Sequence, residues 1–452
     1  MRSEAGCPSQ RSGLDAGGAV DLSGQTYPEG WSIGAGQVAD IQHTLLTEYG
    51  LGRPFVLLDD QARDKATILT DLEEEVFCDR LDQVESALLR IDALIARGRT
   101  LAGFLSYGAA PAFDRFAVRA DLTELSGRPA PLLWFGVFGR QTSGPLPLGA
   151  SLHECALAGG TRLESLVTQR DFEAGARSVL ESIASGEIYQ ANLTFPTRTA
   201  LRDPLATYCR IRSRAKAPLG AMIATGERHV LSFSPELFFR LEGNQLQARP
   251  MKGTRPRHPD PVRDRQLHDE LLGSPKDRAE NLMILDLLRN DMSRVSEPGS
   301  VRCPALFDIE GYPSVWQMTS TVRSRVRAGV GAMDILKALF PCGSIVGAPK
   351  IRASEVIARV ETFGRGLYTG ALGVLGKDRA MFNVAIRTMD VTGAGEGYTG
   401  RLDVGCGIVA DSVPALEWEE CLAKARFAGE VREPDLWATA PSFLPVMAMP
   451  YS

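Results

Sequence analysis

The chain has 452 residues, of which 23 % are charged and 44 % hydrophobic, and its formal net charge is −5. This composition is typical of a globular protein with a large core, and the small negative charge argues against general nucleic-acid binding. No apolar run approaches the length of a membrane span. The eight cysteines form no C-x-x-C pair, which indicates reduced thiols in a cytoplasmic protein rather than a disulfide framework or a zinc site.

Composition divides the chain into four parts. Residues 1–35 are rich in Gly and Ser and are expected to form a disordered tail. We expect an N-terminal region over 36–165, a larger domain over 166–430, and a Pro/Ala-rich surface tail over 431–452. The boundary between the two folded parts is placed at 150–168, after a Gly/Pro-rich stretch.

The N-terminal region begins with a strand, a turn and a second strand over residues 53–71. Apolar residues at helical spacing predict a helix over 80–97, and two further strands are predicted at 101–108 and 131–139. The Gly/Pro-rich residues 140–150 are expected to break the pattern.

Helices and strands are interspersed from residue 169 onward. Helices are predicted at 170–185, 274–291, 333–340, 349–361 and 414–428. Strands are predicted at 187–199, 219–226, 229–233, 236–241, 245–249, 314–326, 367–376, 379–391 and 399–410. Because many neighbouring strands are joined by short turns, antiparallel pairing is expected, and the fold class is α+β.

One lysine stands in an unusual setting, the segment Arg-Pro-Met-Lys-Gly-Thr-Arg-Pro-Arg at 249–257. Prolines restrict the backbone, and Gly253 lets the chain pass close to a ligand. Three nearby arginines would either hold anions or lower the pKa of this amine, and nearby cations together with burial would make Lys252 a neutral nucleophile. The alternative is a solvated lysine in a basic turn.

Two predicted helices carry carboxylates. Ser274 can cap helix 274–291, and Glu280 lies among the apolar residues of this helix. Glu280 is either a ligand for a hard cation or an ion-pair partner of Lys276 at i,i+4, a pair worth about 0.3 kcal/mol. Glu417, Glu420 and Lys424 share one face of helix 414–428, which is expected to be capped by Asp411 or Ser412. A solvated Glu–Lys stripe is an equally good reading of that face.

Three further segments can contribute to a site. Residues 341–350 form a glycine-bearing loop before a helix, which suits an anion or hydroxyl site or a plain structural loop. Glu236 enters a strand of apolar neighbours, where a carboxyl group can hold a proton near neutral pH and act as a general acid, or can simply lie at a sheet edge. Arg387 can pair with a ligand carboxylate or with one of the chain's own acids.

Taken together, these segments resemble the chorismate-utilising family over about residues 168–428. The matching strings are YQANLTFPTR, SFSPELFFR, RPMKGTRPR, SPKDRAENLMILDLLRNDMSRV, FPCGSIVGAPKIRASEVI, RGLYTGALGVLG and GCGIVADSVPALEWEECLAKA. The resemblance implies two large, mostly antiparallel sheets packed face to face with helices outside, and it makes 166–430 the chorismate-binding catalytic domain.

Three positions distinguish branches of this family, and a fourth departs from its usual pattern. Lys252 replaces the alanine of anthranilate synthases and marks the branch that makes 4-amino-4-deoxychorismate. Gln190 stands where isochorismate synthases carry a water-activating lysine, which points to ammonia chemistry, and Asn281 stands where anthranilate synthases usually have histidine. Gln317 stands where many family members have histidine, so no histidine is expected to donate a proton here and Glu236 becomes the expected proton donor.

The resemblance also implies roles for site residues. Lys252 would attack the ring of chorismate while Glu236 protonates the departing hydroxyl, and ammonia would then displace Lys252. Mg²⁺ would be held by Glu280, Glu417 and Glu420. The expected substrate-binding residues are Gln190, Gly253, Thr254, Ser344, Tyr368, Arg387, Gly405, Gly407 and Lys424.

No candidate glutaminase cysteine–histidine pair is evident, so we expect a separate glutamine amidotransferase subunit to deliver ammonia for p-aminobenzoate and folate synthesis. The alternatives are anthranilate synthase component I, against which Lys252 argues, and a non-catalytic chorismate-binding regulator.

Overall fold

The computed structural model describes residues 31, 37–38, 40–118, 131–146, 161–312, 315–395 and 397–434. The predicted tails at 1–35 and 431–452 therefore lie mostly outside the described residues, as does most of the predicted boundary at 150–168. Trp31 is an exception, because its indole N–H donates to the Gly220 carbonyl at 2.6 Å and its ring packs against the core.

The first part of the chain is mainly strand. Its elements are β1 (Gln37–Val38), α1 (Ile41–Gly50), β2 (Phe55–Asp60), β3 (Lys65–Cys78), α2 (Leu81–Ala96), β4 (Leu101–Leu105), the 3₁₀ helix η1 (Tyr107–Ala112) and β5 (Leu133–Pro145). The strands and the helix predicted here are confirmed. However, β5 continues into the stretch expected to break the pattern, because it pairs along its length with the long strand β3.

The second part carries the longer helices. The helices are α4 (Gln169–Ala184), α5 (Pro204–Ala215), α6 (Pro261–Gly273), α7 (Pro275–Ser293), α8 (Ala332–Leu339), the 3₁₀ turn η2 (Gly343–Ile345), α9 (Lys350–Val360) and α10 (Pro414–Ala425). The strands are β6 (Thr161–Ser165), β7 (Gln190–Leu201), β8 (Leu219–Ala224), β9 (Arg228–Ser234), β10 (Leu237–Glu242), β11 (Gln245–Arg249), β12 (Met251–Pro256), β13 (Arg302–Gly311), β14 (Val315–Arg325), β15 (Gly347–Ala348), β16 (Ala371–Gly376), β17 (Arg379–Val384), β18 (Thr388–Ala394), β19 (Gly397–Ile408) and β20 (Gly429–Arg432).

The five helices predicted in this part are confirmed, but α5 and α6 were not predicted. Both begin with the same signal, an aspartate followed by a proline. Asp203 accepts a hydrogen bond from the backbone of α5, and Asp260 does the same for α6. An aspartate N-cap with proline in the first turn is a recognised helix start, so the sequence does contain this information.

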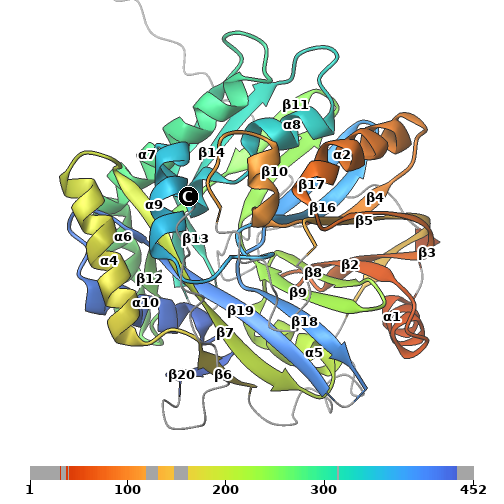
Figure 1. Cartoon of the computed structure of the whole chain (residues 1–452), viewed down its shortest axis with the longest axis horizontal. Coiled ribbons are helices and arrows are strands. Elements are labelled where there is room, and N and C mark those ends of the chain that lie inside the picture. The colour runs from red at the N-terminus through yellow and green to blue at the C-terminus, as the bar shows by residue number, and fades with distance from the viewer. Residues whose placement is uncertain are drawn as a thin grey trace, which may run out of the picture.

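The strands form one continuous hydrogen-bonded network of 20 strands within the described residues. Pairing is antiparallel except between β1 and β5 and between β20 and β6. The two expected sheets are therefore joined by hydrogen bonds. The long strands β3 and β5 pair with each other, and they link β2, which pairs with β3, to β4, which pairs with β5. The α+β class with helices around a large sheet is confirmed (Figure 1).

Pairing also crosses between the two parts of the chain. Strand β2 pairs with β8, and β4 pairs with β16. The N-terminal strands thus extend the sheet of the second part, and the hydrophobic core is shared between them.

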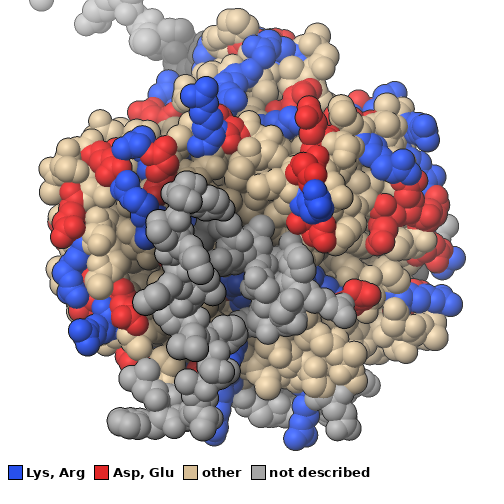
Figure 2. Space-filling model, viewed as in Figure 1, with Lys and Arg blue, Asp and Glu red and all other residues tan. Residues whose placement is uncertain are grey.

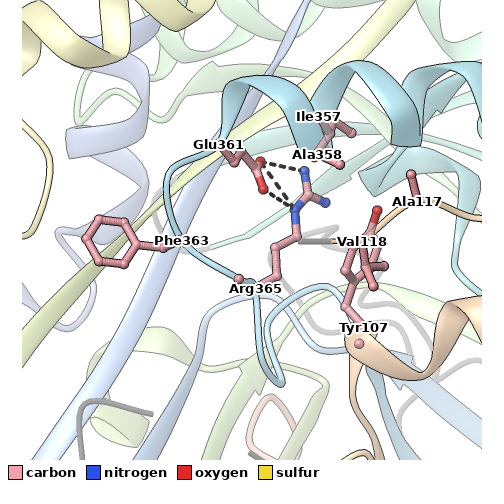
Figure 3. A pocket seen from close by; sticks show the side chains of 10 residues that line it. Tyr107, Ala117, Val118, Ile357, Ala358, Glu361, Phe363 and Arg365 are labelled. Atoms are coloured by element: carbon pink, nitrogen blue, oxygen red, sulfur yellow. Dashed lines mark hydrogen bonds and ion pairs between the residues drawn. The ribbon is translucent and has the colours of Figure 1, made fainter. Parts of the chain in front are cut away.

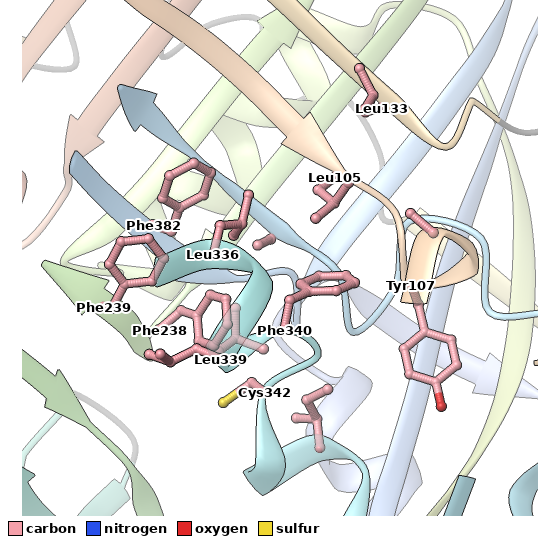
Figure 4. Packing of buried hydrophobic residues seen from close by; sticks show 14 of the residues in the cluster. Leu105, Tyr107, Leu133, Phe238, Phe239, Leu336, Leu339, Phe340, Cys342 and Phe382 are labelled. Carbon is pink, nitrogen blue, oxygen red and sulfur yellow. The ribbon is translucent and has the colours of Figure 1, made fainter. Parts of the chain in front are cut away.

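The core reaches the loop that precedes η2. Phe239 stacks on Phe382 with ring centroids 5.2 Å apart, and Phe238 meets Phe340 edge-on at 6.4 Å. Figure 4 shows this cluster beneath α8, with Cys342 at its edge. Aromatic packing of this kind holds residues 340–342 in place and so fixes where the following loop begins.

Helices α4, α6, α7, α9 and α10 gather at one side of the sheet, and α2 and α8 lie toward another (Figure 1). Acidic and basic side chains are interspersed over the face drawn in Figure 2. None of the helices in the described ranges combines the length and hydrophobicity needed to span a membrane.

Candidate active site

Lys252 lies on a strand. Residues Met251–Pro256 form β12, which pairs with β14, so the expectation of a turn was wrong. The register shifts between Met251 and Thr254 because Gly253 adopts a φ of +91°, which forms a bulge. A side chain on Gly253 would meet Asp277 and Leu271, so this glycine allows α6 and α7 to approach the strand.

The three neighbouring arginines do not act on Lys252 as expected. Arg249 pairs with Glu310, Arg255 with Asp277 at 2.8 Å, and Arg257 with Asp264 at 2.9 Å. The expectation failed because acids distant in sequence neutralise the arginines. The expected effect of burial is present, since burial lowers the pKa of Lys252, and the neighbouring Lys424 ammonium adds to this, against the opposing effect of Glu280 and other carboxylates.

The Lys252 amine points toward the facing strand pair β7–β19. A methyl group added to Gly407 would lie 2.7 Å from Lys252 Nζ and 2.9 Å from Gln190 Nε2. Gln190 is fully buried, and neither polar atom of its side chain has a hydrogen-bond partner among the described residues. A buried amide without partners is costly, so this arrangement suits a polar ligand between Gln190 and Lys252.

Glu236 is the second titratable group at this place. Its side chain is buried directly before β10, and burial raises its pKa to about 7 against the opposing effects of Ser344 and Lys252. The Ser344 hydroxyl donates to Glu236 Oε1 at 2.7 Å, and the Cys342 thiol lies 3.2 Å from the same hydroxyl. Glu236 can therefore carry a proton near neutral pH, as a general acid requires.

The three predicted metal ligands come from two helices. Glu280 is on α7, and Glu417 and Glu420 are on α10. No three acidic, histidine or cysteine side chains in the described ranges lie close enough together to form a metal site. All three carboxylates nevertheless act on the same ammonium group, that of Lys276. The ion-pair partner of Lys276 is Asp411, however, so the three carboxylates share this electrostatic influence without forming a ligand cluster in the described ranges.

Of the two expected helix caps, the one on α7 is confirmed and the one on α10 was wrong. Ser274 caps α7 by accepting a hydrogen bond from the backbone of Asp277. The α10 cap is Val413, with no side-chain bond, so neither Asp411 nor Ser412 caps it. Asp411 instead pairs with Lys276 at 2.8 Å, which links the start of α7 to the loop before α10.

The remaining predicted residues lie at different places around Lys252. Lys424 donates to Glu420 at 2.8 Å and to the Gly405 carbonyl at 3.0 Å. Thr254 is exposed and donates to Gln317 Oε1 at 3.0 Å, while Gln317 donates to the Gly253 carbonyl at 2.8 Å. Gln317 thus fixes the bulge beside Lys252 through hydrogen bonds alone.

Arg387 and Tyr368 are placed by the turns around β17 and β18. Arg387 has a φ of +50° and its guanidinium lies over Phe427 at 5.9 Å. It makes no ion pair within the described part of the chain, which leaves its charge available to a ligand. Tyr368 is buried, and burial raises its pKa.

One group near the site was not predicted. Tyr312 is buried, and its hydroxyl donates to Glu310 at 3.2 Å. Burial raises its pKa, with Arg249 and Arg387 opposing this and Glu236 adding to it. Tyr312 directly follows β13, and the pairing of β13 with β14 brings it to the candidate site. No local sequence pattern around Tyr312 reveals this pairing.

Comparison with known proteins gives three findings. The family model for chorismate binding enzymes matches residues 153–429. The chain is 43 % identical over 263 residues to anthranilate synthase component 1 of Streptomyces coelicolor, covering 58 % of this chain and 51 % of that protein. It is 42 % identical over 262 residues to aminodeoxychorismate synthase component 1 of Klebsiella aerogenes, covering 57 % of each chain. These two alignments span only about half the length of the relatives.

A longer alignment, with anthranilate synthase component 1 of Methanothermobacter marburgensis, is 36 % identical and covers 74 % of this chain and 76 % of the relative. Among solved structures, anthranilate synthase component I from Streptococcus pneumoniae TIGR4 aligns with a TM-score of 0.69 at 22 % identity, over 81 % of this chain and 92 % of that one, which shows the fold. The family match covers more than half of the chain, and the chain belongs to the chorismate-binding enzyme family.

Proposed function

We propose that the protein is the chorismate-converting component of an aminodeoxychorismate synthase, which forms 4-amino-4-deoxychorismate from chorismate and ammonia. The observation that carries the proposal is that Lys252 and Glu236 lie close enough to influence each other's charge. Burial lowers the pKa of the amine and raises that of the carboxyl group to about 7. A neutral amine and a protonated acid are the forms needed for nucleophilic substitution with a poor leaving group.

In the first step, the Lys252 amine forms a bond to ring carbon 2 of chorismate. Both ring double bonds shift, the bond from carbon 4 to its hydroxyl breaks, and Glu236 supplies the proton that lets the oxygen leave as water. In the second step, ammonia bonds to carbon 4, both double bonds shift back, Lys252 departs from carbon 2 as a free amine, and the added nitrogen returns its extra proton to Glu236. The enolpyruvyl group is retained throughout.

The surrounding residues would bind and orient the substrate. Gln190 offers an unpartnered buried amide, and Arg387 offers an unpaired guanidinium for a carboxylate. Glu280, Glu417 and Glu420 would hold Mg²⁺, which when bound supplies positive charge to a substrate carboxylate. Tyr368, Ser344, Gly405 and Gly407 would line the same pocket.

Anthranilate synthase component I is the second candidate, because relatives with that name align as well as those named aminodeoxychorismate synthase. Lys252 favours the first candidate, since the covalent step needs an amine where anthranilate synthases have alanine. Ammonia would come from a separate glutamine amidotransferase subunit, because free ammonia is scarce at neutral pH and the reaction must exclude water.

Lys252 is expected to form a covalent adduct with the substrate. Quenched mixtures of enzyme and chorismate should show a mass increase that maps to the peptide containing Lys252, and Lys252→Ala should abolish both adduct and turnover. Lys276→Ala, which changes a nearby lysine, should keep the adduct. An unmodified wild-type protein together with an active Lys252→Ala would contradict the mechanism.

Gly407→Ala is expected to lower turnover at least about 10-fold, since its methyl group would displace Lys252 and Gln190. The melting temperature should change little, because both contacts are ends of side chains that can move. Gly397→Ala on the same strand has open space around its methyl group and should retain activity. Equal activity of the two variants in a product assay would sink the assignment of this pocket.

The pH profile of kcat should report Glu236. The acid works when protonated, so activity is expected to fall as the pH rises through about 7. Because the Ser344 hydrogen bond lowers the pKa of Glu236, Ser344→Ala should move this fall to higher pH. Ser324→Ala, whose buried hydroxyl bonds Ser296, should leave the profile in place. A profile that does not respond to Ser344→Ala would reassign the titrating group.

Metal binding can be measured apart from activity. Glu280→Gln and Glu420→Gln are expected to weaken Mg²⁺ binding at least about 10-fold in isothermal titration calorimetry with chorismate present. Their melting temperatures should barely change, since exposed ion pairs contribute less than about 1 kcal/mol. Glu419→Gln, on the exposed side of α10, is the matched control. Unchanged Mg²⁺ affinity in Glu280→Gln would assign that residue to structure.

The ammonia source gives a further prediction. The purified chain should form product from chorismate and ammonium salts but not from glutamine. Adding a glutamine amidotransferase subunit should make glutamine a substrate, as followed by chromatography. Glutamine-dependent product from the chain alone would refute the need for a partner.

A further inference from the structure

A buried ion pair lies behind the candidate active site. Glu361 follows α9, Arg365 comes four residues later, and their side chains are 4 % and 1 % exposed. The guanidinium donates to Glu361 through Nε at 3.0 Å and through a terminal nitrogen at 2.8 Å. Burying such a pair removes two charges from water, which often costs as much as the attraction returns, so stability alone does not explain it.

The remaining donors of Arg365 reach three separate segments. One terminal nitrogen donates to the Ile345 carbonyl at 2.9 Å and to the Thr369 hydroxyl at 3.3 Å. The other donates to the Asn192 carbonyl at 2.6 Å. Glu361 in turn accepts from the backbone N–H and the hydroxyl of Thr194, at 3.0 and 2.9 Å.

Each of these segments carries a candidate site residue close by in sequence. Ile345 follows Ser344, Asn192 lies two residues after Gln190, and Thr369 follows Tyr368. The guanidinium therefore holds the loop of η2, the start of β7 and the turn before β16 in one arrangement. A planar fork with five donors can bind several fixed acceptors at once, which a lysine ammonium cannot do in the same geometry.

The far side of Arg365 is closed by an aromatic ring. Its guanidinium lies 4.8 Å from the ring centre of Tyr107, which belongs to η1 in the N-terminal part of the chain. Figure 3 shows the pair and Tyr107 lining a small pocket, whose space of about 290 Å³ includes open solvent. The guanidinium is thus held between the N-terminal part and the candidate active site, where it has little room to move.

We propose that Arg365, held by Glu361, is a positioning residue that aligns the Ser344 loop with the Gln190 strand for catalysis. It touches neither Glu236 nor Lys252 and acts through the segments that carry Ser344 and Gln190. The proposal rests on the proposed function, because it assigns Arg365 a part in that reaction. It also predicts a change in the titration of Glu236, which can be measured without turnover.

The test compares Arg365→Lys with Arg212→Lys. Arg212 forms an equally buried pair with Asp59, at 2.7 and 3.1 Å, and also donates to Asp64 at 3.3 Å. Asp59 lies on β2 and Asp64 directly before β3, away from the segments that Arg365 joins. Both substitutions keep the charge and lose the fork. Similar losses of melting temperature are therefore expected, and any effect on the site itself separates the two.

The first readout is the titration of Glu236, followed by NMR of protein carrying ¹³C-labelled glutamate carboxyl groups and assigned with Glu236→Gln. The groups around Glu236 are the Ser344 hydroxyl, the Met251 backbone N–H, Lys252, Tyr312 and Cys342. Misplacing the Ser344 loop weakens a bond that lowers the pKa of Glu236. Arg365→Lys should therefore raise this pKa, and Arg212→Lys should leave it unchanged.

The second readout is kinetic. Arg365→Lys should lower kcat by about 10- to 100-fold with a smaller change in KM, because misplaced reacting groups act on the chemical step. Thr194→Val removes one donor to Glu361 without changing charge and should shift both readouts in the same direction by less; it also serves if Arg365→Lys does not fold.

The proposal is overturned if Glu236 has the wild-type pKa in both Arg365→Lys and Thr194→Val. It is also overturned if Arg212→Lys shifts the pKa of Glu236 as much as Arg365→Lys does. If the wild type does not convert chorismate but Arg365→Lys still shifts Glu236, the positioning of the loop stands and the proposed reaction fails. Normal turnover with an unshifted Glu236 in both site variants would leave Arg365 a purely structural residue.

Discussion

The burial of Lys252 and Glu236 in one region of the sheet is the constraint on which the rest of this structure depends. Burial opposes both charges, so it lowers the pKa of the amine and raises that of the acid. Mutual attraction works in the opposite direction but does not cancel burial in either group. Burial thus shifts the amine toward the neutral form that nucleophilic attack needs, and it lets the carboxyl group hold a proton near neutral pH.

This constraint explains several features that lie far apart along the chain. The three arginines beside Lys252 in sequence are all paired with carboxylates, so their charges are neutralised by those partners. Gly407 leaves space for the amine, and Gly253 allows α6 and α7 to pack against β12. The continuous sheet brings β7, β12, β19 and the residue before β10 to the same region, although Gln190 of β7 and Gly407 of β19 are more than 200 residues apart in sequence.

Much of the architecture could be predicted because its signals are local. Apolar periodicity located α2 and α4, and the Ser274 cap located α7. The aspartate–proline starts of α5 and α6 were equally local and were overlooked. The candidate residues came from segment chemistry together with the family resemblance, and the structure brings Lys252, Gln190, Gly407 and Ser344–Glu236 into one region.

What could not be predicted depends on contacts between distant segments. No pattern near Arg255 reveals that Asp277 will neutralise it, and none near Tyr312 reveals its approach to Arg387. The Lys252 strand was mistaken for a turn because its two prolines and glycine are turn residues, whereas pairing with β14 decides its conformation. Long-range pairing and ion pairing thus set the protonation of the site.

Identifying the product tests the central claim most directly. The purified chain would be incubated with chorismate, Mg²⁺ and ammonium salts, and the product analysed by chromatography and mass spectrometry. A Lys252-dependent reaction should give 4-amino-4-deoxychorismate, with its enolpyruvyl group intact. Formation of anthranilate, with release of pyruvate, would contradict the account and assign the protein to the other branch of its family.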